Sequence, residues 1–230
     1  MLPEWFPPSH QESAEHIRAY LVGIRGGAPF LSGADCRLLV DWLDDEVPMP
    51  AILCAIDRVS LRRRSKRVRT RLSLNSCKGE LNKVLSKGKG LPAFDTEATN
   101  NEESPPLNGL ALLSHKIISS LNKDKKFVKE QIILAEAIQK ISTDDRDHQS
   151  IATDAIQLIT TFHIDIWQRS IAKHELFTQE AEEELSDLQS LLSAIRWQEA
   201  VDEVARDRLR AQFPLLTAQM IWNALNQVLV

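Results

Sequence analysis

The chain has 230 residues, of which 43% are hydrophobic and 26% are charged. This composition is typical of a globular protein with a sizeable core, and it excludes a disordered chain, a collagen and a disulfide-rich miniprotein. The formal net charge of −4 conceals a basic segment, since residues 58–89 contain 12 Lys and Arg side chains and a single acid, Glu80.

The first two predicted helices are marked by their caps. Ser9 and Glu12 form a predicted capping box that opens an amphipathic helix, and Gly26–Gly27 ends it. Ser32 is the predicted N-cap of a second helix, with Asp35 near the positive end of the helix dipole. Apolar residues recur at helical spacing within both segments, so each helix is expected to bury one face.

A third and a fourth helix are predicted around the basic segment. Pro50 suits the first turn of the third helix, which runs into the arginine-rich stretch 62–71, and a fourth helix is expected over about 75–86. From residue 88 to residue 108 the periodicity is lost, as in a linker. We therefore predict an N-terminal domain over 1–87, a linker over 88–108 and a C-terminal domain over 109–230.

The second half of the chain is predicted to be helical throughout. A helix is expected directly after the linker and another from Asp124, and the polar stretch 142–147 marks a break. Residues 145–213 contain no Pro or Gly, but length statistics favour two or three helices over one very long helix. A second break is predicted at 174–180, with Thr178 as a cap.

The end of the chain carries two further predicted helices. An apolar stripe from Leu185 to Ile195 predicts one continuous helix, and Thr217 is the predicted cap of a last helix. The last segment is apolar around much of its surface, so it can either close the core or offer a helix to a partner. The whole pattern predicts an all-α fold of two helical domains, a small N-terminal one and a C-terminal helical bundle.

Residues 28–86 contain a characteristic set of apolar and capping positions. The set consists of Phe30-Leu31-Ser32, Asp35, Leu38-Leu39, Trp42-Leu43, Val47-Pro48, Ile52 and Ala55-Ile56. On these positions the segment resembles the DnaD-like domain of bacterial replication-initiation proteins. The resemblance implies a small helical domain associated with DNA replication. Uncharacterised bacterial proteins share the segment, and for them the resemblance implies a fold alone.

The basic strip is the strongest local signal for binding. It consists of Arg58, Arg62, Arg63, Arg64, Lys66, Arg67, Arg69, Arg71, Lys78 and Lys83. Arginines at this density attract phosphates, and no aromatic side chains are interleaved for base stacking. We therefore expect a nucleic-acid-associated accessory protein that binds without sequence preference.

Three other interpretations of the basic strip remain. The strip can dock on an acidic partner, in which case the chain is a helical adaptor or a structural subunit of a protein complex or homo-oligomer. It can also contact the acidic second half of its own chain, or it can simply be solvated. No membrane partner is expected, because the sequence contains no apolar run long enough to span a bilayer.

The sequence offers no motif for catalysis. It contains no G-x-S-x-G, no phosphate-binding loop and no G-x-G-x-x-G, so we expect no enzymatic activity and no cofactor. The cluster Asp144, Asp145, Asp147 and His148 is interpreted as an acidic helix start rather than a cation site. Three cysteines without C-x-x-C spacing and the absence of a signal-peptide pattern predict buried thiols, no bound metal and a cytoplasmic location.

Overall fold

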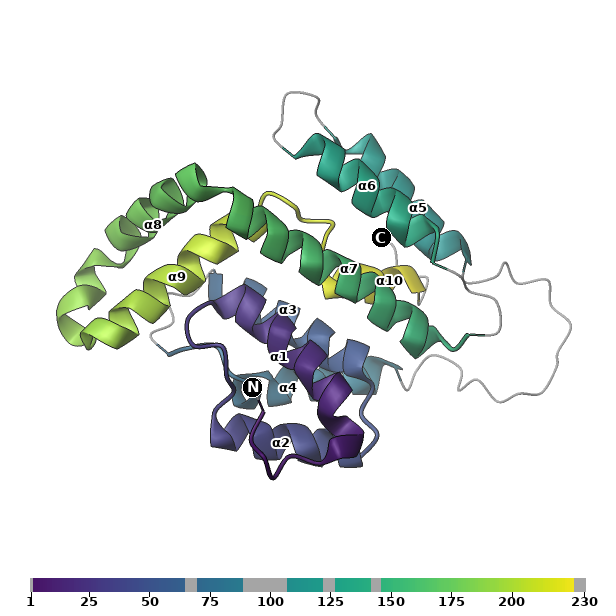
Figure 1. Ribbon diagram of the computed structural model, residues 1–230, viewed down its shortest axis with the longest axis horizontal. Helices are drawn as coiled ribbons and strands as arrows, with labels where there is room; N and C mark the ends of the chain where they lie inside the picture. The colour runs from purple at the N-terminus through teal and green to yellow at the C-terminus, as the bar shows by residue number, and fades with distance from the viewer. Residues whose placement is uncertain (1, 65–69, 89–106, 122–126, 142–145, 226–230) are drawn as a thin grey trace, which may run out of the picture.

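The computed structural model describes residues 2–64, 70–88, 107–121, 127–141 and 146–225, and all regular elements within these ranges are helical (Figure 1). The α-helices are α1 (Gln11–Arg25), α2 (Gly33–Asp44), α3 (Met49–Arg64), α4 (Leu74–Gly88), α5 (Leu107–Ser119), α6 (Val128–Gln139), α7 (His148–Arg169), α8 (Ile171–Leu185), α9 (Ala194–Arg210) and α10 (Ala218–Leu225). Two 3₁₀ segments, η1 (Pro8–His10) and η2 (Ser186–Leu191), precede α1 and α9. The predicted all-α fold class is confirmed for the described residues.

The long helix α7 runs through the middle of the molecule (Figure 1). Helices α1–α4 lie on one side of it, the α5–α6 hairpin lies on the other, and the α8–α9 hairpin extends beyond one end. The short helix α10 packs against α3, α5 and α7 and thereby joins the two sides. Ile221, Ala224 and Leu225 of α10 are buried, so residues 218–225 close the core.

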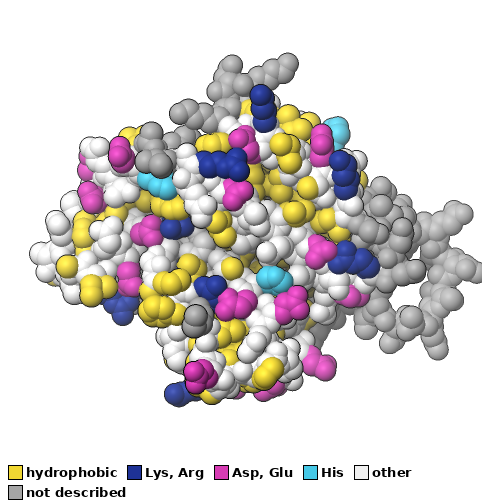
Figure 2. All heavy atoms as spheres, in the orientation of Figure 1, with side chains coloured by type: hydrophobic (Ala, Val, Ile, Leu, Met, Phe, Trp, Pro, Cys, Tyr) yellow, Lys and Arg dark blue, Asp and Glu magenta, His cyan; other side chains and the backbone are white. Residues whose placement is uncertain are grey.

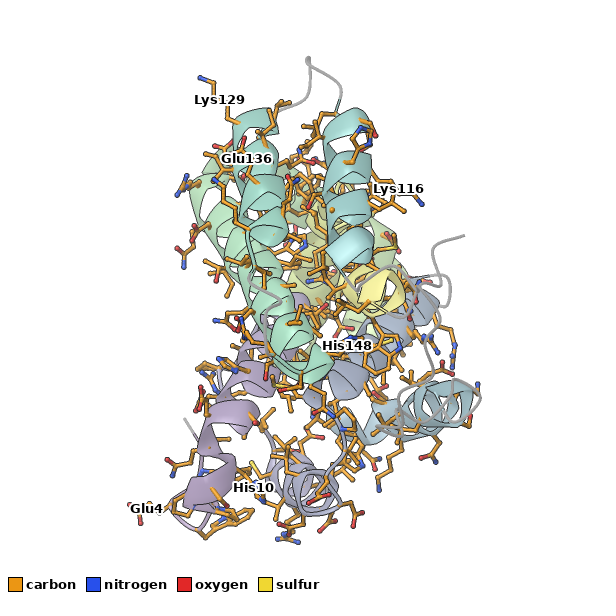
Figure 3. All side chains as sticks on the ribbon, turned by 90° about the vertical axis from the view of Figure 1, so that its right-hand side faces the viewer. Glu4, His10, Lys116, Lys129, Glu136 and His148 are labelled. Atoms are coloured by element: carbon orange, nitrogen blue, oxygen red, sulfur yellow. The ribbon has the colours of Figure 1, made fainter. Side chains whose placement is uncertain are left out.

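The molecular surface carries charges of both signs. On the face shown in Figure 2, acidic, basic and hydrophobic side chains are interspersed. The side view in Figure 3 shows Lys116 on α5 and Lys129 on α6 pointing away from the hairpin that these two helices form. A substitution on the outward side of this hairpin can therefore change the surface charge without disturbing the core.

The core is shared between the two halves of the chain. Buried apolar residues from α1–α4 and from α5–α10 belong to one hydrophobic cluster, because α1 packs on α7 and α9 while α3 packs on α7 and α10. The predicted division into two domains is not confirmed by this arrangement. The predicted linker 88–108 lies largely outside the described residues.

The predicted cap at Ser32 and the predicted helix start at Asp147 are confirmed. The hydroxyl of Ser32 accepts a hydrogen bond from the backbone N–H of Asp35 at 3.0 Å, at the start of α2. The carboxylate of Asp147 accepts one from Ser150 at 2.9 Å and so begins α7, as the predicted acidic helix start requires. The predicted helix start at Asp124 lies outside the described residues.

The predicted capping box at Ser9 is wrong. Ser9 lies within η1, and α1 begins at Gln11 after His10, which makes no side-chain cap. Pro8, whose ring fixes its backbone φ, sits at the first position of this 3₁₀ turn, so the α-helix starts one residue later than the cap predicts. Gly26 does end α1 as predicted, with a φ of 63°.

The predicted break at 174–180 is also wrong, because α8 continues through Thr178. Phe177 and Ala181 are buried on one side of α8, which packs on α9, so tertiary packing overrides the polar composition of this stretch. The chain breaks earlier, at Ser170 between α7 and α8.

The apolar stripe from Leu185 to Ile195 does not form one helix. Residues 186–191 form η2, and Ser193 then caps α9 by accepting a hydrogen bond from Arg196 at 3.4 Å. This interruption rotates the helical phase, so Leu188 is buried whereas Ile195 is 75% exposed.

Candidate nucleic-acid interface

The ten residues of the basic strip fall into three groups. Arg58, Arg63 and Arg71 are half-buried against the rest of the protein. Arg62, Lys78 and Lys83 are exposed on α3 and α4. The side chains of the remaining four lie outside the described part of the structure, namely Arg64, Lys66, Arg67 and Arg69. The strip therefore does not form one continuous surface among its described residues.

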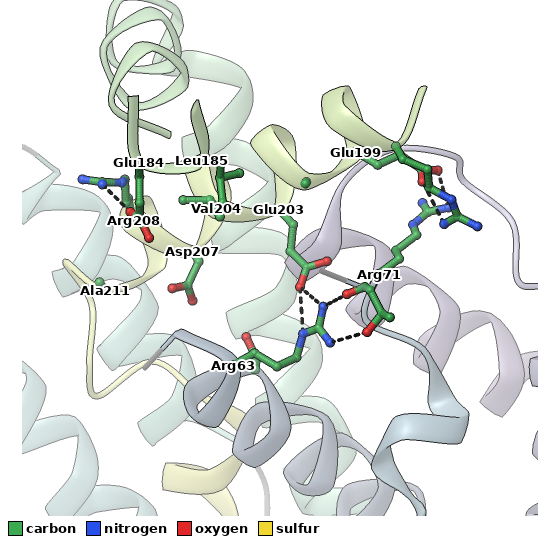
Figure 4. A pocket seen from close by; sticks show the side chains of 14 residues that line it. Arg63, Arg71, Glu184, Leu185, Glu199, Glu203, Val204, Asp207, Arg208 and Ala211 are labelled. Atoms are coloured by element: carbon green, nitrogen blue, oxygen red, sulfur yellow. Dashed lines mark hydrogen bonds and ion pairs between the residues drawn. The ribbon is translucent and has the colours of Figure 1, made fainter. Parts of the chain in front are cut away.

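Arg63 is held by an acidic side chain of α9. Its guanidinium lies 3.1 Å from Glu203, and it also donates to the carbonyl of Thr70 (Figure 4). The second carboxylate oxygen of Glu203 accepts a hydrogen bond from the N–H of Leu72 at 3.2 Å. Burial raises the pKa of Glu203, and the charge of Arg63 beside it acts in the opposite direction. Separating such a half-buried pair is costly, so Arg63 acts here as an anchor.

Arg71 forms a second anchor one turn of α9 away. Arg71 Nη1 lies 2.8 Å from Glu199 Oε1, and Nη2 donates to the carbonyls of Gly26 and Ala28 at 3.0 and 3.3 Å. Arg196 reaches the other oxygen of Glu199 at 3.3 Å. The Arg71–Glu199 pair therefore connects the end of α1, the segment that precedes α4 and the start of α9.

The close approach at the end of α1 depends on glycine. The N–H of Gly27 donates to Asp202 of α9 at 2.7 Å, and Gly27 has a φ of 67°. A Cβ atom on Gly26 would lie 1.7 Å from Asp202 Oδ2. The Gly26–Gly27 pair therefore both ends the helix and lets the backbone reach the acidic face of α9.

A cavity of about 300 Å³ lies between α3, α8 and α9 at these ion pairs (Figure 4). Its charged lining consists of Arg63, Arg71, Arg196, Arg208, Glu184, Glu199, Glu203 and Asp207. Arg208 pairs with Glu180 at 2.6 Å and with Glu184 at 2.7 Å, which fixes α8 on α9. The close pairing of opposite charges indicates a joint between helices rather than a site with a free charge.

Arg58 belongs to the junction with α10. Its Nε donates to the side-chain oxygen of Gln219, which also accepts from the thiol of Cys54 at 3.0 Å. The neighbouring Asp57 is buried and receives the guanidinium of Arg210 at 3.0 Å. Arg58 therefore serves internal packing and is not displayed to a partner.

The exposed residues of the strip keep a positive excess. Arg62 and Lys83 both bind the carboxylate of Glu80, the latter at 2.8 Å, and these contacts lower the pKa of Glu80. Lys78 is exposed on the same helix, α4. Two of these exposed cations thus share one buried carboxylate, and Lys78 adds a third exposed positive charge to the described part of α3 and α4.

The alternative that the strip contacts the acidic second half of its own chain holds for Arg63 and Arg71, but sequence reasoning did not identify the acids. Glu199 and Glu203 are four residues apart, which places both carboxylates on one face of α9. The spacing is visible in the sequence. It does not reveal that the strip would meet this face, because the two segments are separated by more than a hundred residues.

The described part of the chain offers no support for a metal site, a disulfide or a membrane-spanning helix. No group of three His, Cys, Asp or Glu residues there could hold a metal ion. Cys36, Cys54 and Cys77 are buried and unpaired as disulfides. None of the described helices combines the length and the apolar character needed to cross a membrane.

Comparisons of the chain with protein-family models, with curated proteins and with solved structures give no match. The resemblance of residues 28–86 to DnaD-like domains therefore stays a prediction.

Proposed function

We propose that the chain is a non-enzymatic accessory protein that binds the phosphate backbone of nucleic acid through Arg62, Lys78 and Lys83. The observation that carries the proposal is the group of three exposed cations on α3 and α4, of which Arg62 and Lys83 share the carboxylate of Glu80 and Lys78 is exposed on the same helix as Lys83. The resemblance to DnaD-like domains supports a role in DNA replication.

The chemistry of this edge fits phosphate rather than bases. Lys83 is 63% exposed and Arg62 is 48% exposed at the side chain, so both can reach a polyanion at little desolvation cost. Phosphate contacts release counterions and carry no sequence information. Binding is therefore expected to be salt-dependent and equally strong for unrelated sequences. Arg58, Arg63 and Arg71 act as structural anchors in this proposal.

The test is the salt dependence of binding to unrelated DNA and RNA duplexes and single strands, measured by fluorescence anisotropy. On duplex DNA the log–log slope should be about −0.9 for each phosphate contacted. The double variant Lys78→Ala/Lys83→Ala should weaken binding of all sequences alike and make the slope less negative by up to about 1.8, since two contacts are lost.

The matched control is Lys129→Ala/Lys140→Ala, which removes the same charge from two exposed positions, one on α6 and one directly after it. This control should bind nucleic acid like the wild type. Absence of affinity for every nucleic acid at about 50 mM salt, where phosphate binding is strong, would overturn the proposal. So would an equal loss in the two double variants.

A second candidate function is a helical adaptor that docks on an acidic protein surface. It is favoured by the pairs Arg63–Glu203 and Arg71–Glu199, in which the basic strip already binds carboxylates of a protein helix. Salt-sensitive binding to polyglutamate with no affinity for DNA or RNA would favour this function. Lys78→Ala/Lys83→Ala should then weaken the binding to polyglutamate.

A further inference from the structure

A second cavity lies between the α1–α2 connection, residues 70–73 and the start of α9. Its volume is about 530 Å³, within the range of roughly 300–1,000 Å³ that small-molecule sites occupy. Arg25, Arg71 and Arg196 line it together with Phe30, Leu192 and Asp35. None of the three residues proposed above to bind nucleic acid lines this cavity.

Arg25 is a buried cation without a carboxylate bound to it. The residue is 3% exposed, and its two terminal nitrogens donate to the carbonyls of Leu72 and Phe30 at 3.2 and 2.7 Å. Its Nε has no hydrogen-bond partner among the described residues. Burial, and then the charge of Arg71, lower the pKa of Arg25 to about 10, although the charges of Asp35, Glu203 and Glu199 act in the opposite direction. A buried charge in this state is stabilised by any anion that comes close.

The other charges of the cavity leave room for an anion. Glu199 is shared between Arg71 and Arg196, at 2.8 and 3.3 Å, and the Nε of Arg71 also lacks a partner. Asp35 is the carboxylate on the cavity wall, and it accepts a hydrogen bond from the N–H of Asn75 at 3.3 Å. Two of the three guanidiniums therefore keep a buried donor that no described group accepts from.

The rim of the cavity is apolar. Phe30 lines it and is 58% exposed, so its ring is open to contact with a ligand. Leu192 lines the same cavity and is half-buried. The arginines at the floor of the cavity attract a phosphoryl group, and the exposed ring at its rim can pack against a planar group. A ligand that carries both groups therefore suits this cavity.

We propose that this cavity binds a mononucleotide-sized phosphate ester. The phosphoryl group is bound by Arg25, Arg71 and Arg196, and the planar heterocycle lies against Phe30. Bidentate Arg contacts explain the preference for phosphate, and the volume of the cavity limits the ligand to a small molecule. The proposal does not depend on nucleic-acid binding, because the residues involved are different.

The test is isothermal titration calorimetry of the full chain with AMP, inorganic phosphate and adenosine. AMP should bind more tightly than either fragment. Arg196→Gln, at a side chain that is 60% exposed, should weaken AMP and phosphate about tenfold, the effect of losing one charge-assisted hydrogen bond. Phe30→Ala should weaken AMP and leave phosphate unchanged, since Arg25 contacts only the backbone carbonyl of Phe30.

The matched control is Arg37→Gln, which removes an exposed arginine of α2 outside the cavity. This variant and Lys78→Ala/Lys83→Ala should bind AMP like the wild type. The proposal is overturned if millimolar AMP and phosphate give no binding heat, if Arg37→Gln and Arg196→Gln weaken AMP equally, or if Phe30→Ala leaves AMP affinity unchanged.

Discussion

Single side chains connect the first helices to the last. Asp57 is 2% exposed and accepts hydrogen bonds from the hydroxyl of Tyr20 at 2.6 Å, from Arg210 at 3.0 Å and from the N–H of Gln219 at 3.1 Å. The N–H of Ala218 donates to the same tyrosine hydroxyl at 3.1 Å. One carboxylate thus satisfies the first turn of α10 and neutralises a buried guanidinium.

The buried side chain of His163 on α7 makes the free energy of unfolding depend on pH. Its Nε2–H donates to the carbonyl of Leu216 at 2.8 Å, while the buried Nδ1 has no partner. Burial, and then the charge of Arg210, lower the pKa of His163 to about 3. The unfolded chain takes up the proton near pH 6.5 and the folded chain does not. The free energy of unfolding should therefore fall by about 1.4 kcal/mol per pH unit between about pH 6 and pH 4 from this residue alone.

The measurement is urea unfolding at a series of pH values. His163→Gln keeps a donor for the carbonyl of Leu216 but cannot titrate, so its stability should depend less steeply on pH in this window. His115→Gln, at an exposed position of α5, should keep the wild-type slope. Equal slopes for wild type and His163→Gln would show that His163 is not kept neutral by burial.

Helix starts offer a test at the next level of structure. Ser32→Ala removes the hydroxyl that accepts from Asp35 and should lower the free energy of unfolding by about 1 kcal/mol. Ser9→Ala should change it by less than about 0.5 kcal/mol, because exposed Ser9 lies in η1 and caps no α-helix. Both changes in the free energy of unfolding are to be measured by chemical denaturation. A larger loss of stability for Ser9→Ala would show that Ser9 does cap the helix, as predicted from the sequence.

The sequence was sufficient for elements whose signals are local. The caps at Ser32 and Asp147 and the stop at Gly26 depend on neighbouring residues, and the structure confirms them. The break at Ser170 and the continuous α8 depend on packing against α9, which no local pattern reveals. The same limit applies to the candidate interface, because the partners of Arg63 and Arg71 come from a helix that is distant in the chain.

The molecule as a whole should unfold in one step. Helices α1 and α3 bury apolar residues against α7, α9 and α10, so neither half keeps its core when the other unfolds. Unfolding by urea should give coincident curves by far-UV circular dichroism and by tryptophan fluorescence. The fluorescence reports on Trp5 and Trp42 in the first half and on Trp167, Trp197 and Trp222 in the second. Two separate transitions would instead favour the predicted pair of domains.

The junction at Asp57 also sets the timing of folding during synthesis. Arg210 follows Asp57 by 153 residues and Gln219 follows it by 162. At roughly 5–20 residues per second, a ribosome needs about 8–30 s to add the first of these partners. During this interval α1 and α3 have left the ribosome while the surfaces that α9 and α10 will cover are open to solvent. The apolar surface of the first half therefore stays exposed until the last helices have been synthesised.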